Sequence, residues 1–149
     1  MEGNRRDFDK MSDKNFENLM NEIRKKIESD EKKIYSQKVI NEYKNPTNFG
    51  IIKNPDAKAE IKGPCGDTMK ITLKLKDELI TDARFWTDGC GPSISCGNML
   101  TKMIKDKKVE EALAFKKNEL IIALDGLPKE NLHCAKLATD TLHKALKKS

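Results

Sequence analysis

Three short stretches of the chain each place one cysteine beside glycine, proline or histidine. They read GPCGD at residues 63–67, DGCGP at residues 88–92 and LHC at residues 132–134. A cysteine acts as a nucleophile or a metal ligand through its thiolate, which forms where the local potential is positive and solvent reaches the sulfur. Glycine-flanked turns and helix starts are poor positions for a core residue. We therefore predict that Cys65, Cys90 and Cys134 serve a shared metal site rather than packing.

Two of these cysteines are predicted to lie at the starts of helices. Proline is favoured at the first position of a helix, so Pro92 places Cys90 at a helix N-terminus. Asn131 is a good N-cap, and the apolar residues after Cys134 recur with helical spacing. The helix dipole and the free N–H groups at both starts favour an anion, and hence a thiolate. We expect Cys134 to be an exposed thiol of low pKa, which suits thiol exchange.

The third cysteine, Cys65, lies in a turn that leads into the clearest strand signal of the chain. Apolar and polar residues alternate over residues 69–76, and a return strand follows over residues 79–87. In an antiparallel pair, the residues before the first strand and those after the second lie at the same end. The hairpin therefore brings Cys65 close to Cys90, and we expect all three sulfurs to meet at one exposed end of the molecule.

The N-terminal part of the chain is predicted to be an extension, with a solvated tail over residues 1–12 followed by a helix. The helix is amphipathic, because apolar residues recur on one stripe; they are Phe16, Leu19, Met20, Ile23 and Ile27. Such stripes usually bury against their own core, so we expect this one to pack on the following domain rather than to bind a partner.

The rest of the chain is predicted to be a single α+β domain. A helix, a short edge strand and the hairpin are followed by four helices, in the order expected for a small, mostly antiparallel three-stranded sheet covered by helices on one face. The predicted division is an N-terminal extension over residues 1–33 and a domain over residues 34–149. Cys96 lies inside the helix that Pro92 begins, and we expect it to be a core residue.

Charge and hydropathy exclude several classes of function. The net charge of +5 is mild, and the lysines are interleaved with acidic residues, so we expect no binding to nucleic acid. The sequence has neither the apolar run of a secretory signal nor one long enough to cross a bilayer, so we expect a cytoplasmic protein without a membrane partner. In that compartment the 4 cysteines should be reduced thiols rather than disulfides.

The three cysteine motifs, taken in order, resemble those of the iron-sulfur cluster assembly scaffold proteins of the NifU N-terminal or IscU type. Residues 35–50 also look like the first helix and turn of that family, so the resemblance runs from about Tyr35 to the end of the chain. It implies the α+β fold described above. It also implies a scaffold, not an enzyme, on which a labile [2Fe-2S] cluster is built from iron and sulfur and then passed to apo-proteins.

The resemblance also implies a set of ligands. The cluster-binding and metal-binding residues are Cys65, Asp67, Cys90, His133 and Cys134, with either Asp67 or His133 as the fourth donor beside three thiolates. Four such donors suffice for Fe²⁺ entry and a transient [2Fe-2S] cluster, and the same set would bind one Zn²⁺ tetrahedrally. A carboxylate is a hard ligand for a sulfur-rich iron centre, so Asp67 should make the cluster easier to transfer.

The partners implied by the resemblance are a cysteine desulfurase, a ferredoxin and apo iron-sulfur acceptor proteins. The desulfurase delivers persulfide sulfur to Cys134, and the ferredoxin supplies electrons. The resemblance does not extend to the segment that docks an Hsp70-type chaperone, because this chain reads LPKEN at residues 127–131 where many members read LPPVK. We therefore do not count this chaperone among the expected partners.

Two functions of other classes remain as alternatives. A structural zinc domain would use the metal only to hold the fold, but such domains usually need close Cys-x-x-Cys pairs, which this sequence lacks. A sulfurtransferase enzyme would use Cys134 as its persulfide nucleophile, and its activity would survive the loss of Cys65 and Cys90.

Overall fold

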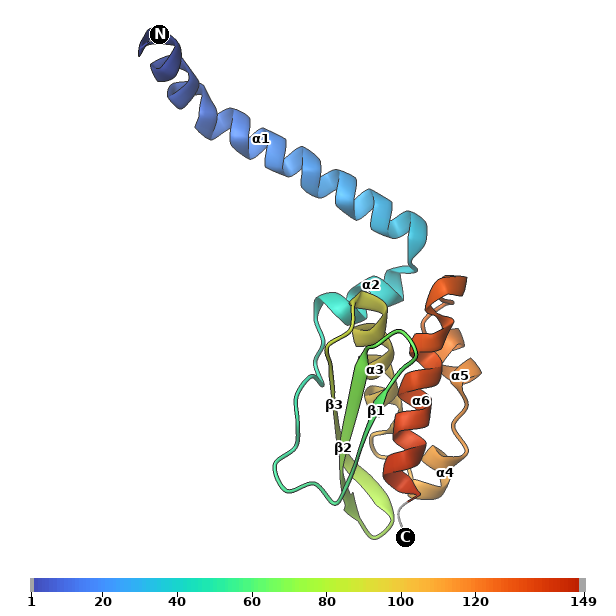
Figure 1. Cartoon of the computed structure of the whole chain (residues 1–149). Helices are drawn as coiled ribbons and strands as arrows, with labels where there is room; N and C mark the ends of the chain where they lie inside the picture. The colour runs from blue at the N-terminus through green and yellow to red at the C-terminus, as the bar shows by residue number, and fades with distance from the viewer. Residues whose placement is uncertain (1, 148–149) are drawn as a thin grey trace. The chain divides into compact units, whose positions relative to one another are not determined.

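The computed structural model describes residues 2–147, and it describes side-chain environments from residue 14 onward. The helices and strands follow one another in the order shown in Figure 1, namely α1 (Glu2–Ile34), α2 (Gln37–Lys44), β1 (Ala57–Lys62), β2 (Thr68–Lys76), β3 (Leu79–Thr87), α3 (Gly91–Ile104), α4 (Val109–Leu113), α5 (Lys117–Ala123), the 3-10 helix η1 (Lys129–Asn131) and α6 (Leu132–Leu146). Contacts divide the chain into two units, residues 1–34 and residues 35–149, and each is described by itself below.

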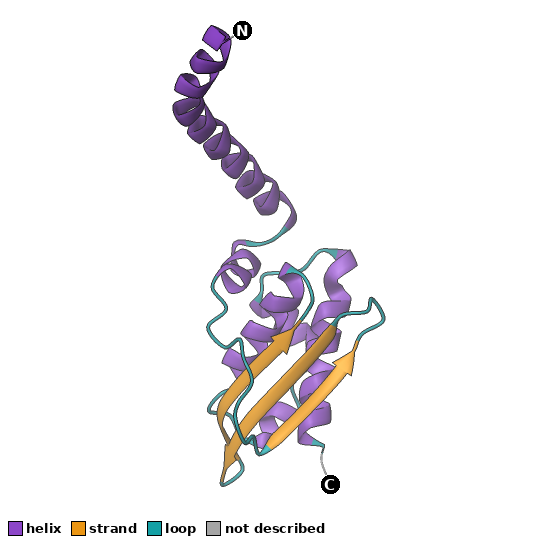
Figure 2. Cartoon of the chain, turned by 60° about the vertical axis from the view of Figure 1, so that its left-hand side comes forward, coloured by secondary structure: helices purple, strands orange, loops and turns teal. Residues whose placement is uncertain are grey.

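The second unit contains a three-stranded antiparallel sheet in the order β1-β2-β3. Helices cover one face of this sheet, and the loop before β1 runs across part of the other, where the N–H of Ile52 donates to the Thr72 hydroxyl (Figure 2). α3 packs on β3, while α6 packs on β1 and β2. The α+β class, the antiparallel three-stranded sheet and the helices on one face are thus confirmed.

The alternation of β2 sorts its side chains between the two faces. Met69, Ile71 and Leu73 point into the core and are fully buried, whereas Lys70 and Lys74 lie on the other face. Burying apolar side chains against the helices is the main force that holds sheet and helices together. α3 approaches the sheet closely at Gly97, where an added Cβ would lie 2.4 Å from the Phe85 ring.

α2 is fixed to the helical layer by buried polar contacts. Ser36 is its N-cap and accepts a hydrogen bond from the backbone N–H of Val39 over 3.1 Å. Near the other end of α2, Glu42 accepts hydrogen bonds from Asn98 over 2.8 Å and from Lys102 over 3.0 Å, both on α3. These contacts hold α2 against α3.

The first unit is a single helix, α1, which begins at Glu2. The predicted start of this helix after residue 12 is therefore wrong, because residues 2–12 are helical as well, and Met1 lies outside the described residues. Once a helix is nucleated, each added residue gains one backbone hydrogen bond, so a helix over the amphipathic stretch extends readily through the charged residues before it. Within this unit taken by itself, the apolar stripe is exposed; its members include Phe16 at 61%, Leu19 at 52% and Ile27 at 52%. The expected packing of the stripe on the following domain stays a prediction.

Candidate functional site

The strand pairing of the hairpin sets the position of the first two cysteine motifs. Met69 at the start of β2 pairs with Thr87 at the end of β3. Just beyond this pair, the backbone N–H of Thr68 donates to Oδ1 of Asp88 over 2.7 Å, and the Thr87 hydroxyl donates to the carbonyl of Thr68 over 2.7 Å. The loop before β2 and the loop after β3 are thus tied together, as the hairpin predicted.

Cys65 is exposed at the tip of a tight turn between β1 and β2. The turn is closed by hydrogen bonds from the N–H of Gly66 to the carbonyl of Gly63 and from the N–H of Gly63 to the carbonyl of Asp67, over 3.0 and 2.7 Å. Gly66 has a φ of 93°, a backbone conformation that residues other than glycine rarely adopt. The turn brings the Cys65 thiol within 3.5 Å of Oδ2 of Asp67, to which it donates.

Cys90 is the N-cap residue of α3 and is exposed. Its carbonyl accepts the first hydrogen bond of the helix, from the N–H of Ile94 over 3.1 Å, and Pro92 occupies the first turn. The prediction that Cys90 lies at a helix N-terminus is therefore confirmed. Its sulfur lies where the helix dipole favours a negative charge.

Cys134 is the third residue of α6, and it is only 1% exposed. The expectation of an exposed Cys134 is therefore wrong. The reason is its place on the helix, because Cys134 shares one face with Ala138, Thr141 and Ala145, which are all buried. Its sulfur lies 3.5 Å from the hydroxyl of Ser93 and 3.6 Å from Nε2 of His133.

The expectation of a low pKa for Cys134 is also wrong. Burial raises the pKa of its thiol, because a buried thiolate loses its hydration. The hydrogen bond with Ser93 lowers the pKa by a smaller amount, and the negative charges of Cys90, Cys65 and Asp67 raise it further. In the metal-free protein, Cys134 is therefore held as a neutral thiol at neutral pH.

Gly89, in the loop between β3 and α3, contacts the first motif directly and is connected to the third through Ser93. A Cβ on Gly89 would lie 2.6 Å from Oγ of Ser93 and 2.9 Å from Oδ2 of Asp67, so only glycine allows this approach. The Asp67 carboxylate and the Ser93 hydroxyl, which contacts Cys134, thus lie against the same residue. In Figure 1 the β1–β2 loop, the start of α3 and the start of α6 lie at the same end of the domain.

Among the described residues, the side chains at this end do not form a closed metal cage. Within the described residues, no group of three or more His, Cys, Asp or Glu side chains is arranged to hold a metal ion. The ligand set of Cys65, Asp67, Cys90, His133 and Cys134 therefore stays a prediction. What the structure shows is pairwise contact, between Cys65 and Asp67 and between His133 and Cys134.

Cys96 lies in the core and is fully buried, which confirms its predicted packing role. Burial raises the pKa of its thiol well above the ordinary value. Sequence reasoning missed two other residues at this end, Ser93 and Gly89. The sequence signal that could have found Ser93 is its place one turn into the helix that Cys90 caps, where its side chain faces the same end.

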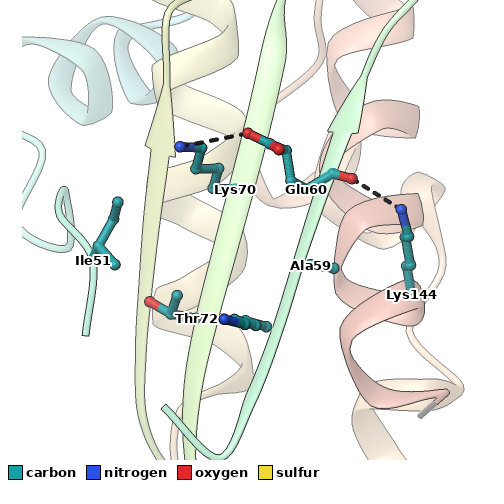
Figure 3. Close-up of a pocket in the computed structure, with 7 residues that line it drawn as sticks. Ile51, Ala59, Glu60, Lys70, Thr72 and Lys144 are labelled. Carbon is teal, nitrogen blue, oxygen red and sulfur yellow. Dashed lines mark hydrogen bonds and ion pairs between the residues drawn. The ribbon is translucent and has the colours of Figure 1, made fainter. Parts of the chain in front are cut away.

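A pocket of about 520 Å³ lies elsewhere, on the face of the sheet opposite the helices (Figure 3). Its lining is mostly charged: Lys70 pairs with Glu60 over 3.5 Å, and Lys144 donates to the Glu60 carbonyl over 3.1 Å. The cysteine motifs lie at the edge of the domain where β1 ends, β2 begins and β3 ends, not in this pocket.

Fold and site together define a class: an α+β domain whose three cysteine-bearing motifs are gathered at one end of a three-stranded sheet. Residues 34–149 match the family model of the NifU-like N-terminal domain, and the chain belongs to that family. None of the helices within the described residues combines the length and the apolar character needed to cross a bilayer.

Relatives named as iron-sulfur cluster assembly scaffold proteins support the same assignment. The iron-sulfur cluster assembly scaffold protein IscU 1 of Archaeoglobus fulgidus is 42% identical over 114 residues, which cover 76% of this chain and 74% of that protein. The scaffold protein IscU of Escherichia coli (strain K12) is 40% identical over 117 residues, which cover 75% of this chain and 91% of that protein.

A solved structure shows the same fold. The crystal structure of the N-terminal part of a nitrogen-fixing NifU-like protein from Brucella abortus superposes with a TM-score of 0.61 at 18% identity. The superposition covers 76% of this chain and 92% of the other.

Proposed function

We propose that this protein is a scaffold for iron-sulfur cluster assembly, on which a labile [2Fe-2S] cluster is built and then passed to apo-proteins. The observation that carries the proposal is the arrangement at Gly89. This residue of the second motif lies against the Asp67 carboxylate of the first motif and against Ser93, whose hydroxyl contacts the sulfur of Cys134 in the third. The relatives named as IscU scaffold proteins support iron-sulfur cluster assembly as the function of this arrangement. The protein itself is not an enzyme in this scheme.

The donor set suits iron and sulfide. Thiolates from Cys65, Cys90 and Cys134 are the soft ligands that iron-sulfur clusters use, and the fourth donor comes from Asp67 or His133. The cluster and its Fe²⁺ are cargo, and Zn²⁺ can occupy the same four donors. Because Cys134 is buried and protonated before loading, the loops around it must open and the thiol must lose its proton when metal or sulfur arrives.

Sulfur reaches the site as persulfide from a cysteine desulfurase, with Cys134 as the acceptor. Each persulfide sulfur must gain two electrons to become sulfide, and a ferredoxin supplies them. The exposed ends of Cys65 and Cys90 face solvent, where an apo iron-sulfur protein can take over the finished cluster by ligand exchange. We assign these steps to residues 34–149 and treat residues 1–33 as a separate extension.

Anaerobic reconstitution of the full chain with Fe²⁺ and sulfide tests the proposal. The expected result is a visible [2Fe-2S] spectrum that decays when an apo-ferredoxin is added, while the ferredoxin gains its own spectrum. A colourless protein that holds one tight Zn²⁺ and takes up no cluster would contradict it and favour a structural zinc domain. Sulfur transfer that continues without Cys65 and Cys90, with no cluster formed, would favour a sulfurtransferase.

A further inference from the structure

Ser93 is a buried serine whose hydroxyl contacts the sulfur of Cys134. Both residues are 1% exposed, and the two atoms lie 3.5 Å apart. Ser93 is the third residue of α3 and Cys134 is the third residue of α6, so the contact joins the starts of two helices. A buried hydroxyl costs free energy unless it is hydrogen-bonded, and here the sulfur supplies that bond.

The surroundings of Ser93 fix where its hydroxyl can lie. On one side, the backbone of Gly89 comes so close that an added Cβ would lie 2.8 Å from Cβ of Ser93 and 2.6 Å from its Oγ. The same Cβ would lie 2.9 Å from Oδ2 of Asp67. The hydroxyl is therefore held between Gly89 and the sulfur of Cys134.

The direction of this hydrogen bond changes when Cys134 reacts. As a thiol, Cys134 can either donate or accept, and the Ser93 hydroxyl can do both. A sulfur that is bonded to iron or to a second sulfur has no proton left and can only accept, so the hydroxyl must then donate. Hydrogen bonds to charged acceptors are stronger than neutral ones, and those to cluster sulfurs raise the reduction potential by stabilising the electron-rich state.

We propose that Ser93 is a positioning residue for the chemistry of Cys134: its hydroxyl, which lies beside Gly89, holds the sulfur in place and donates a hydrogen bond to it once it carries persulfide or iron. The inference rests on the scaffold function proposed above. It concerns a residue that coordinates nothing itself and acts only through Cys134.

The step that Ser93 assists is a balanced sulfur transfer. The Cys134 sulfur attacks the outer sulfur of the desulfurase persulfide, and a new S–S bond forms as the old one breaks. The electron pair of the broken bond leaves on the desulfurase cysteine as a thiolate, which takes up the proton lost by Cys134. Neither an oxidant nor a reductant is consumed in this step.

The chain offers a matched control in Ser95. This serine is also fully buried on α3, but its hydroxyl donates to the backbone carbonyl of Val39 over 2.6 Å rather than to a sulfur. Ser95→Ala therefore removes a buried hydroxyl and a hydrogen bond from the same helix without touching Cys134. Ser93→Thr provides a second comparison, because it keeps a hydroxyl at the site.

The first readout is persulfide formation on the metal-free full chain, with a cysteine desulfurase and free cysteine as the sulfur source. Mass spectrometry follows the extra sulfur on the peptide that holds Cys134. Ser93→Ala is expected to slow its formation about tenfold, the size expected for the loss of a hydrogen bond to a charged group. Ser95→Ala should stay within about twofold of wild type, and Ser93→Thr should retain most of the rate.

The second readout is the reduction potential of the reconstituted cluster, which a purely structural role would not move. Ser93→Ala is expected to shift the potential to more negative values, and Ser95→Ala to leave it unchanged. The inference is overturned if Ser93→Ala behaves like wild type in both readouts. It is also overturned if Ser93→Ala and Ser95→Ala behave alike, or if Ser93→Thr loses as much as Ser93→Ala. Each of these results would leave the proposed scaffold function standing. A wild-type protein that takes up neither sulfur nor cluster would overturn the scaffold function as well.

Discussion

The backbone N–H of Thr68 donates a hydrogen bond to Oδ1 of Asp88 over 2.7 Å, and this bond links the loop of Cys65 to the loop of Cys90. Thr68 begins β2 and Asp88 directly follows β3, so the bond continues the strand pairing one step beyond the sheet. The distance between two proposed ligands of one cluster thus depends on a side chain that is itself not a ligand.

Asp88→Ala is expected to shorten the lifetime of the cluster more than it lowers the stability of the fold. The lost hydrogen bond is exposed and is worth about 1 kcal/mol, because water replaces it, but the two cysteine loops then move independently. Cluster decay under a chelator and thermal unfolding of the metal-free protein measure the two effects. Asp140→Ala, which removes a surface ion pair with Lys136, is the control and should change neither. Unchanged decay in Asp88→Ala would contradict the linkage.

Gly89→Ala is expected to disrupt the site directly. The added Cβ would lie 2.6 Å from Oγ of Ser93 and 2.9 Å from Oδ2 of Asp67, so one of the loops must shift. Such overpacking typically destabilises a protein by about 1–3 kcal/mol. Gly91→Ala is a milder comparison, because its Cβ would meet the Tyr43 ring at 3.2 Å. Equal cluster uptake by Gly89→Ala and wild type would show that the site does not depend on these contacts of Gly89.

Much of this arrangement follows from local rules that the sequence displays. The alternation over residues 69–76 and the return strand fix the hairpin, and the hairpin fixes the neighbourhood of the first two motifs. Pro92 fixes the helix start at Cys90. Cys96, in the interior of that helix, lies in the core as its position predicts.

The features that sequence reasoning missed depend on tertiary packing. Cys134 is buried because its face of α6 packs on the domain, and the residues around it in the sequence do not reveal which face that is. The contact between Ser93 and Cys134 joins residues 41 positions apart, and a serine in a helix has many possible partners. The start of α1 at Glu2 reflects helix propagation, which charged residues tolerate well.

The stability of the metal-free protein is expected to fall in alkaline solution. Burial raises the folded-state pKa of Cys134 and, more strongly, of Cys96. Below the ordinary cysteine pKa of about 8.5 both thiols are neutral in the folded and unfolded states, so their stabilising contribution is complete. Above it the unfolded chain releases protons first, and stability is lost until the pH passes the raised folded-state values.

Urea unfolding at a series of pH values measures this dependence. Cys96→Ala removes the thiol with the larger shift, so the decline of its unfolding free energy with pH should be shallower than that of wild type. The same slope in both proteins would contradict the effect of burial on Cys96.

Asp67→Ala is expected to hold the cluster longer than wild type does. The carboxylate is a hard ligand in a sulfur-rich site and lies 3.5 Å from the Cys65 sulfur, where it can compete for iron during release. The rate of cluster transfer to an apo-ferredoxin measures this effect, with Asp140→Ala as the surface control. Equal or faster transfer from Asp67→Ala would count against the role of the carboxylate.

Removal of residues 1–33 is expected to leave cluster assembly intact, because the match to the NifU-like N-terminal domain begins at residue 34 and the proposed ligands lie beyond it. The yield of reconstituted cluster per chain, compared between the shortened and full chains, checks this. A shortened chain that folds with an unchanged circular dichroism spectrum of the domain but binds no cluster would show that the extension is part of the site.

The most direct test is the amount of iron bound per chain after anaerobic reconstitution of four alanine variants, at Cys65, Cys90, Cys134 and Cys96. The scaffold account predicts that each of the first three variants loses the [2Fe-2S] spectrum and most of its iron, while Cys96→Ala, which removes only a buried core thiol, retains both. Retention of a wild-type cluster by the variant at Cys65, Cys90 or Cys134 would contradict the account, because those three sulfurs would then not share one site.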